Sequence, residues 1–151
     1  MPEVLVAMAV LAILAVVGFG QGGELLARQR VEAALKRVEQ GLNRARAEAV
    51  RRGAPCGIRL GDGVWMPPAP SSHLEPCFSA EEPIAESRVQ ISHNFPDPLR
   101  FSRNGLVLDG GSVVLRSQGT DLQRCLVMSL PLGVTRMGHQ GANGCEADPA
   151  L

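Results

Sequence analysis

Four cysteines and three histidines are the side chains of this chain best suited to disulfide bonds or to a zinc-type metal site. No Cys-x-x-Cys pair occurs, and no histidine stands at zinc-finger spacing from a cysteine. An even number of cysteines is typical of disulfides in a domain exposed to an oxidising compartment. We therefore expect disulfides and no metal site. The cysteines are Cys56, Cys77, Cys125 and Cys145, and the histidines are His73, His93 and His139.

Three pairings of the four cysteines are open. The sequence-local choice joins Cys56 to Cys77 and Cys125 to Cys145, so that each bond closes a loop of about twenty residues. In the chain-entropy model, a disulfide that closes a loop of that size stabilises the folded state by roughly 3 kcal/mol.

Motifs that carry catalysis are missing from the sequence. It contains no Gly-x-Ser-x-Gly, no phosphate-binding glycine-rich loop and no His-Glu-x-x-His. Glu81 and Glu82 are adjacent carboxylates in a proline-rich stretch, which favours a solvated loop over an acid–base pair. The sequence predicts neither an enzyme nor a cofactor.

Glu3 is the charged residue with the most unusual surroundings. It precedes Val4 to Gly20, seventeen residues without a charged or strongly polar side chain, and the next charge is Glu24. An apolar run of about 17–25 residues is long enough to cross a bilayer as a helix. We therefore expect residues 1–23 to be the transmembrane part of an N-terminal helix.

Three interpretations of this segment are open. A cleaved secretory signal needs basic residues before the apolar run, whereas the first basic residue is Arg28; the small residues of 18–23 do suit a cleavage site. A permanent single-span anchor would leave a carboxylate at the edge of the hydrocarbon, which is costly without a partner. The third interpretation rests on a resemblance.

The stretch Pro2-Glu3-Val4-Leu5 and the alanine-, valine- and leucine-rich residues up to Ala15 resemble the start of a mature type IV pilin or pseudopilin. The family's glutamate maps to Glu3 and the residue before it to Pro2. The resemblance implies that Pro2, Glu3, Val4 and Leu5 serve assembly, with Glu3 pairing with the N-terminal amine of a neighbouring subunit. It also implies prepilin-type N-terminal methylation and a precursor that a prepilin peptidase cuts.

Met1 stands where this family has its third mature residue, and the family's basic leader and its glycine are not part of the sequence. We expect the codons just upstream of Met1 to encode a basic stretch that ends near Gly-Phe-Thr.

Residues 24–53 continue the helix as an amphipathic segment. Its apolar positions recur every three or four residues, at Val31, Leu35, Val38, Leu42, Ala45 and Ala49. Basic residues lie opposite, at Arg30, Lys36, Arg37, Arg44, Arg51 and Arg52. We interpret this basic side as solvated, with lipid head groups as an alternative contact. Gly53, followed by Ala54 and Pro55, is a helix stop, and the four glycines of residues 18–23 are a weak point.

Residues 54–151 are predicted to form a globular, mostly β head. Eight prolines between residues 54 and 98 exclude long helices there. Turn residues separate short apolar runs. The predicted strands are 57–60, 64–66, 89–92, 99–102, 106–108, 111–116 and 125–130. The expected fold class is therefore α+β, with a long N-terminal helix packed on a mostly antiparallel sheet.

Three segments resemble the GspH/FimT branch of pseudopilins and minor pilins. They are the end of the helix from Leu42 to Gly53, the turn from Phe101 to Gly105, and Leu132 to Arg136 near the C-terminus. Some FimT-type members bind DNA through a Gly-Arg-x-Arg segment, where this chain keeps Arg136 but has Val134 in place of the first arginine. Arg136, with Arg124 and His139 as neighbours, is thus a candidate DNA contact.

Charge weighs against DNA as the main partner. Residues 1–52 hold eight Lys/Arg and five Glu, whereas residues 53–151 hold seven Arg and ten Asp/Glu, a net charge of −3 for the head. Binding a polyanion by bulk charge needs a basic surface. The sequence therefore predicts a minor pilin or pseudopilin in the inner membrane, with its head on the periplasmic or extracellular side. Its partners would be other pilins, and a FimT-like DNA-binding pilin or a bitopic protein that displays a β-domain for protein binding remain alternatives.

Overall fold

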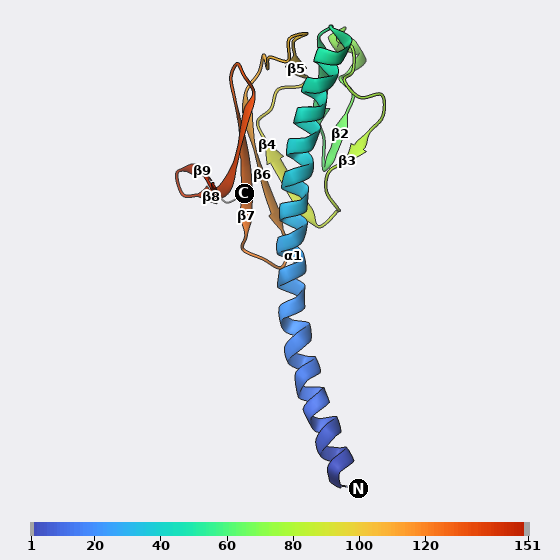
Figure 1. Ribbon diagram of the computed structural model, residues 1–151, viewed down its shortest axis with the longest axis vertical. Coiled ribbons are helices and arrows are strands. Elements are labelled where there is room, and N and C mark those ends of the chain that lie inside the picture. Colours follow the sequence, from blue (N-terminus) through green and yellow to red (C-terminus); the bar gives the residue numbers. More distant parts are fainter. Residues whose placement is uncertain (1, 150–151) are drawn as a thin grey trace.

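The computed structural model describes residues 2–149, except for the side chains of residues 2, 5 and 16–21. A single helix, α1 (Pro2–Arg52), runs along the molecule; its second half lies against the head and its first half projects away from it (Figure 1). Gly53 ends the helix with a φ of 63°, and its N–H donates to the carbonyl of Val50 at 3.1 Å. Glycine adopts this left-handed conformation without a Cβ penalty, so the predicted helix stop is confirmed.

Short strands make up the head in the described part of the chain. In order they are β1 (Cys56–Leu60), β2 (Val64–Met66), β3 (Glu82–Pro83), β4 (Val89–His93), β5 (Leu99–Phe101), β6 (Gly111–Ser117), β7 (Gln123–Ser129), β8 (Val134–Gly141) and β9 (Gly144–Ala147). One 3-10 turn (Pro70–Ser72) follows β2.

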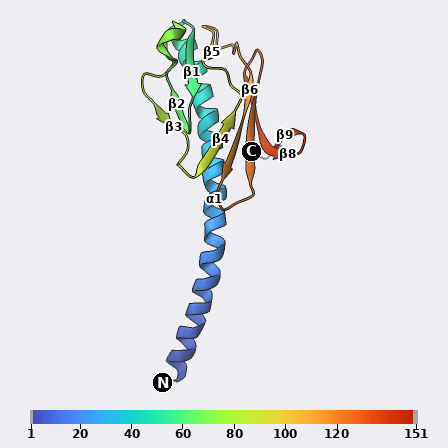
Figure 2. The same cartoon turned by 180° about the vertical axis from the view of Figure 1, so that it is seen from behind.

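The strands form two antiparallel sheets that flank the second half of α1 (Figure 2). The smaller sheet has the order β3-β2-β1-β5, and the larger sheet has the order β4-β6-β7-β8-β9. The helix packs on β1 and β5 of the first sheet and on β4, β6 and β7 of the second. The expected α+β class, a long helix on antiparallel strands, is confirmed.

The apolar stripe of α1 forms one wall of the core. All six positions that the periodicity predicts are 2% exposed or less, and Ala27 and Ala34 extend the stripe. The opposite wall comes from the inward faces of both sheets, for example Ile58 and Phe101 in one and Val113, Leu115 and Leu126 in the other. Burial of this stripe fixes α1 to the head, because a single helix gains most of its stability from packing of its apolar face.

Most of the predicted strands are present. The hairpin of β1 and β2, with its turn at residues 61–63, is confirmed, as are strands at 89–92, 99–101, 111–116 and 125–129. The strand predicted at 106–108 is wrong, since only Val107 makes an isolated bridge, to Phe101. The N–H of Val107 donates to Pro131 and that of Leu108 to Arg100, so this segment bonds to two different partners and forms a loop.

Both disulfides of the sequence-local pairing are present. Cys56–Cys77 has a Cα–Cα distance of 5.1 Å and joins β1 to the loop before β3. Cys125–Cys145 has a Cα–Cα distance of 5.8 Å and joins β7 to β9. Gly138 of β8 lies between Cys125 of β7 and Ala147 of β9. An added Cβ at Gly138 would stand 1.8 Å from the carbonyl oxygen of Glu146 in β9. The hairpin of β8 and β9 therefore folds back closely over the sheet.

Candidate assembly surface

The first half of α1 carries aliphatic side chains that the head does not cover. Seven of these side chains are between 50% and 66% exposed: Val4, Val6, Met8, Val10, Leu11, Ile13 and Leu14. Leu25 and Leu26 are 58% and 52% exposed, and contact with the head begins at Ala27, which is 2% exposed. An exposed apolar surface of this extent is typical of a site that binds protein or membrane.

A membrane-spanning role was expected for residues 1–23. Within the described part of the chain, no helix is both long and apolar enough to cross a membrane. The expected weak point at residues 18–23 lies within the unbroken helix α1, and its side chains up to residue 21 lie outside the described ones.

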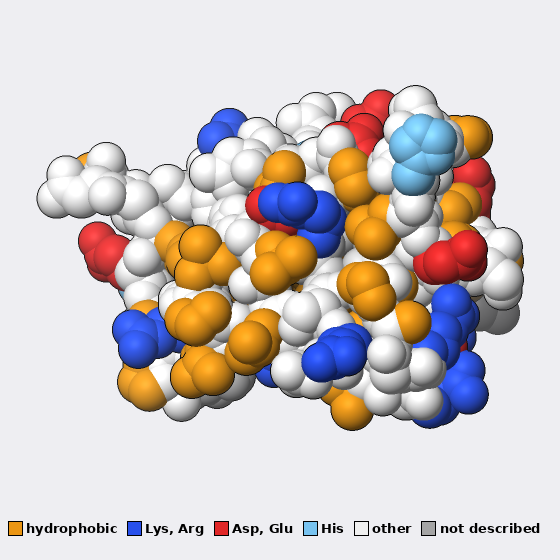
Figure 3. Space-filling view, turned by 90° about the horizontal axis from the view of Figure 1, so that it is seen from above, with side chains coloured by type: hydrophobic (Ala, Val, Ile, Leu, Met, Phe, Trp, Pro, Cys, Tyr) orange, Lys and Arg blue, Asp and Glu red, His pale blue; other side chains and the backbone are white. Residues whose placement is uncertain are grey.

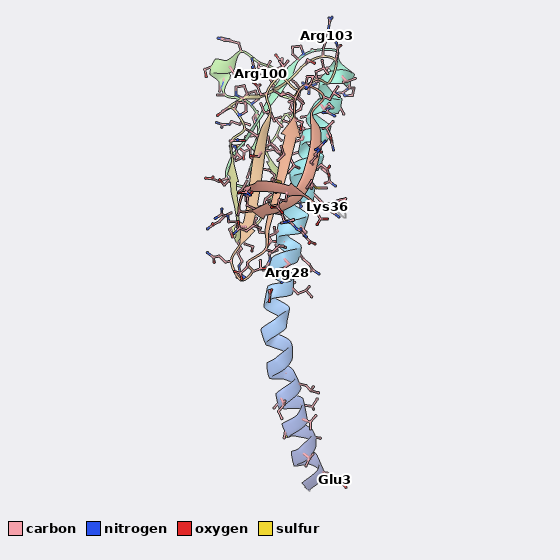
Figure 4. The ribbon with its side chains drawn as sticks, turned by 90° about the vertical axis from the view of Figure 1, so that its left-hand side faces the viewer. Glu3, Arg28, Lys36, Arg100 and Arg103 are labelled. Atoms are coloured by element: carbon pink, nitrogen blue, oxygen red, sulfur yellow. A yellow bond between two sulfur atoms is a disulfide. The ribbon has the colours of Figure 1, made fainter. Side chains whose placement is uncertain are left out.

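Glu3 lies at the far end of α1 from the head (Figure 4). Its side chain is exposed and stands in the first turn of the helix, where the helix dipole favours a negative charge. It has no ion-pair or hydrogen-bond partner among the residues that the structure describes. Val4 is 58% exposed beside it, whereas the side chains of Pro2 and Leu5 lie outside the described ones. A carboxylate among exposed aliphatic side chains is thus available to a cationic partner from outside the chain.

The basic side of α1 is largely neutralised by carboxylates. Arg28 pairs with Glu24 at 2.7 Å, Arg30 with Glu86 at 3.2 Å, and Arg44 with Glu82. Arg51 and Arg52 both bind Glu48 at 2.6 Å. Lys36 is exposed and has no ion pair in the described residues (Figure 4). This side of the helix is therefore a poor polyanion-binding surface.

The two arginines at the end of α1 also change the acidity of their partner. Hydrogen bonds from Arg51, and then from Arg52, lower the pKa of Glu48 to about 2 from its ordinary value of 4.5. Arg52 donates in addition to the carbonyl oxygen of Pro76 at 2.9 Å. The ion pairs of Glu48 thus help to join the helix end to the loop that carries Cys77.

The candidate DNA contacts do not gather into one cationic cluster. On β7, Arg124 lies opposite His139 of β8. Arg136 of β8 lies opposite Val127, which is three residues after Arg124 on β7. Side chains alternate between the two faces of a strand, so Arg124 and Arg136 project from opposite faces. The side chain of Arg124 is only 14% exposed and pairs with Glu32 at 3.0 Å and with Asp148 at 3.7 Å.

His139 pairs with Glu146 at 3.0 Å. Arg136 alone of these residues is an exposed cation without an ion-pair partner in the described part of the chain. In residues 2–149, no three His, Cys, Asp or Glu side chains lie close enough together to hold a metal ion, and all four cysteines are in disulfides.

The structure also shows an apolar surface that sequence reasoning missed. It lies at the end of the head farthest from Glu3 and appears as a group of hydrophobic side chains in the view from above (Figure 3). We call it the tip patch, and its members are Val50, Leu106, Leu108, Leu130, Leu132 and Val134, between 37% and 63% exposed. Two Leu-x-Leu runs, at 106–108 and 130–132, are its signal in the sequence. The first has the pattern of a strand, and the second is divided between the predicted strand that ends at Leu130 and the GspH/FimT-like segment that begins at Leu132.

Residues 34–131 match the family described as type II transport protein GspH. The chain belongs to the GspH family. The match covers the buried half of α1 and most of the head, and it ends just before the segment that contains Arg136. No curated protein and no solved structure matches the chain. Membership confirms the resemblance to GspH/FimT-type pseudopilins, and it implies assembly with other pseudopilins.

Proposed function

We propose that this GspH-family chain is a minor pilin or pseudopilin subunit that assembles into a type II secretion filament or type IV pilus through the first half of α1. The observation that supports the proposal is the division of the helix at Ala27. Beyond it the apolar stripe is buried by the subunit's own head, and before it the large aliphatic side chains that the structure describes are exposed. Those side chains remain to be covered by lipid or by helices of other subunits.

Two environments would cover this surface in turn. Before assembly the first half of α1 lies in the inner membrane, with the head on the periplasmic side, after a prepilin peptidase has cut the precursor and the new N-terminus has been methylated. On assembly the helix leaves the lipid and packs among other pilin helices. The apolar lipid tails are replaced by apolar side chains of other helices, so the hydrophobic effect contributes little net free energy to this transfer.

Glu3 supplies the specific contact in this proposal. Among apolar helices its carboxylate would be a costly unpaired charge unless it binds the N-terminal amine of a neighbouring subunit. Losing one partner of such a buried pair costs roughly 3–5 kcal/mol. We expect Glu3→Ala to leave the head folded and to abolish incorporation into filaments, measured by immunoblotting sheared filament fractions from cells.

Glu24→Ala is the matched control, because Glu24 lies on the same helix in an exposed pair with Arg28. This variant should assemble at the wild-type level, since exposed ion pairs contribute only about 0–1 kcal/mol. Wild-type incorporation of the Glu3→Ala chain would overturn the role of Glu3. A catalytic function is not part of the proposal.

DNA binding is the alternative that the FimT resemblance leaves open, and it now depends on Arg136. Strong binding to the phosphates of DNA needs several cationic side chains. Arg124 cannot be counted among them, because it forms ion pairs with Glu32 and Asp148. A gel-shift titration at low salt decides between the two. A shift that Arg136→Ala removes supports DNA binding, whereas no shift at tens of micromolar protein excludes it. A bitopic protein that displays its β-domain to another protein would instead remain in the membrane fraction even with Glu3 in place.

A further inference from the structure

The tip patch is one continuous surface formed by three separate segments. The N–H of Val107 donates to the carbonyl of Pro131 at 2.9 Å, which joins the loop after β5 to the turn between β7 and β8. A Cβ on Gly105 would stand 2.9 Å from Cγ2 of Val50, so the same loop also lies on the end of α1. The guanidinium of Arg46 donates to the carbonyl of Leu132. These contacts hold the backbone under the patch and leave its aliphatic side chains outward.

Large exposed aliphatic side chains occur in two places only within the described residues. One is the tip patch and the other is the first half of α1, at residues 4–26. They lie at opposite ends of the molecule (Figure 4). One chain therefore cannot cover its own tip patch with its own helix, but a second copy can supply the helix.

Charge also matches these two surfaces. The ionisable side chains described on α1 before Arg28 are the carboxylates of Glu3 and Glu24. Glu24 is paired with Arg28 of its own chain at 2.7 Å, so Glu3 is the carboxylate of this segment that has no partner among the described residues. Beside the tip patch, Arg103 lies in its loop (Figure 4), and Arg136 stands two residues after Val134 on the same face of β8. Both arginines are exposed and have no ion-pair partner among the described residues. The rim of the patch is thus cationic, and the unpaired charge on the aliphatic helix is negative.

We infer that the tip patch binds the exposed first half of α1 from a second copy of this chain, a contact that rests on the proposed function. At 1.5 Å per residue, a parallel copy shifted along the helix axis by about 36–69 Å brings residues 4–26 beside Val50. The contact joins two different surfaces of the same chain, so each copy keeps one free end for the next. Such a head-to-tail contact propagates into an open filament unless its rotation closes a ring.

Photo-crosslinking in cells tests this contact with the full-length chain. Two differently tagged copies are expressed together, with a photoreactive benzophenone amino acid at position 132 in one of them. The expected product is a dimer that carries both tags, with the crosslinked peptide of the second copy inside residues 4–26. Crosslinks confined to the same chain, to the head of the second copy or to a different protein would each overturn the inference.

Variants of the tip patch and its rim test which side chains make the contact. One copy carries the benzophenone at position 11 of its helix, and the other copy carries the substitution. Leu108→Asp together with Leu132→Asp should lower the yield of the two-tag dimer at least tenfold, whereas Ala142→Asp, at an exposed turn, should not change it. Arg103→Glu should lower the yield more than Arg88→Glu, which changes the net charge equally. Equal yields within either pair contradict the inference. Retention of both disulfides on non-reducing gels shows that the variants fold.

This outcome is separable from that of the Glu3 experiment. The crosslink is read as a dimer, whereas the role of Glu3 is read as incorporation into sheared filaments. A specific dimer together with normal assembly of Glu3→Ala would leave the tip contact standing and remove the role of Glu3. Loss of the dimer together with blocked assembly of Glu3→Ala would do the reverse.

Discussion

Gly41 determines how closely α1 approaches the smaller sheet. A Cβ at this position would stand 2.1 Å from Nε1 of Trp65, and Trp65 is only 1% exposed. A glycine inside a helix costs about 1 kcal/mol relative to alanine. Here that cost is offset, because the missing side chain makes room for the indole ring at the centre of the core.

The same substitution should therefore have opposite effects at two positions of α1. We expect Gly41→Ala to lower the free energy of unfolding by about 1–3 kcal/mol, since it overpacks the core against Trp65. Gly23→Ala should not lower it, because nothing lies within 4 Å of a Cβ there. Urea unfolding followed by the fluorescence of the single tryptophan measures both. A Gly41→Ala chain as stable as the wild type would show that the indole can move.

Glu48 makes a pH-dependent contribution to stability. Arg51 and Arg52 lower its pKa from 4.5 to about 2, so the folded chain binds this proton more weakly than the unfolded chain does. The stabilisation is therefore fully present above about pH 4.5 and is lost as the pH falls towards 2. The hydrogen bonds of Arg100 likewise lower the pKa of Asp109 below its ordinary value.

We expect Glu48→Gln to lower the urea midpoint at neutral pH and to lose this effect on acidification. The difference between wild type and variant should shrink between pH 4.5 and about 2, where the wild-type carboxylate takes up its proton. Glu81→Gln is the control, because Glu81 is exposed and has no partner among the described residues. A difference that stays constant down to pH 2 would contradict the assignment.

At the scale of elements, the helix was the easiest part of the fold to predict and the last strands were the hardest. The stripe from Val31 to Ala49 repeats over several turns, and a single buried face produces that pattern. In β8, by contrast, the residues facing α1 include Thr135, which hydrogen-bonds Glu39 at 3.1 Å, so no apolar alternation marks the strand. The disulfide to Cys145 and the close fit at Gly138 hold β9 in place, and neither depends on local pattern.

The prediction of the candidate site had a similar limit. Glu3 and the aliphatic run were visible because they are consecutive in sequence. The tip patch was not, because Val50, Leu106 and Leu132 come together only when α1, the loop after β5 and the β7–β8 turn meet.

The hairpin of β8 and β9 should open selectively when its disulfide is removed. We expect Cys125→Ala with Cys145→Ala to destabilise the head by roughly 3 kcal/mol and to raise amide hydrogen exchange in β9 most of all. Cys56→Ala with Cys77→Ala is the matched variant, since the closed loops differ by one residue in length. It should raise exchange in β1 and in the loop before β3 instead. Uniform exchange across the head in both variants would show that neither bond acts locally.

At the scale of the whole molecule, the residues that stabilise the head and the residues that form the exposed apolar helix are different parts of the chain. Among the side chains of α1 that the structure describes, those buried in the core lie at Ala27 or beyond, and both disulfides lie in the head. The first half of α1 thus adds exposed apolar surface without supporting the head.

A fragment of residues 24–151 should therefore fold like the full chain and stay monomeric. Its urea midpoint should match that of the full chain, because the buried stripe that begins at Ala27 is intact. It keeps the tip patch but lacks nearly all of the aliphatic helix that we assign to that patch, so light scattering should give a monomer mass at high concentration. Adding a synthetic helix of residues 2–26 in mild detergent should give a complex that Leu132→Asp weakens and Ala142→Asp does not. A fragment that dimerises alone, and stops doing so with Leu132→Asp, would show instead that two tip patches bind each other.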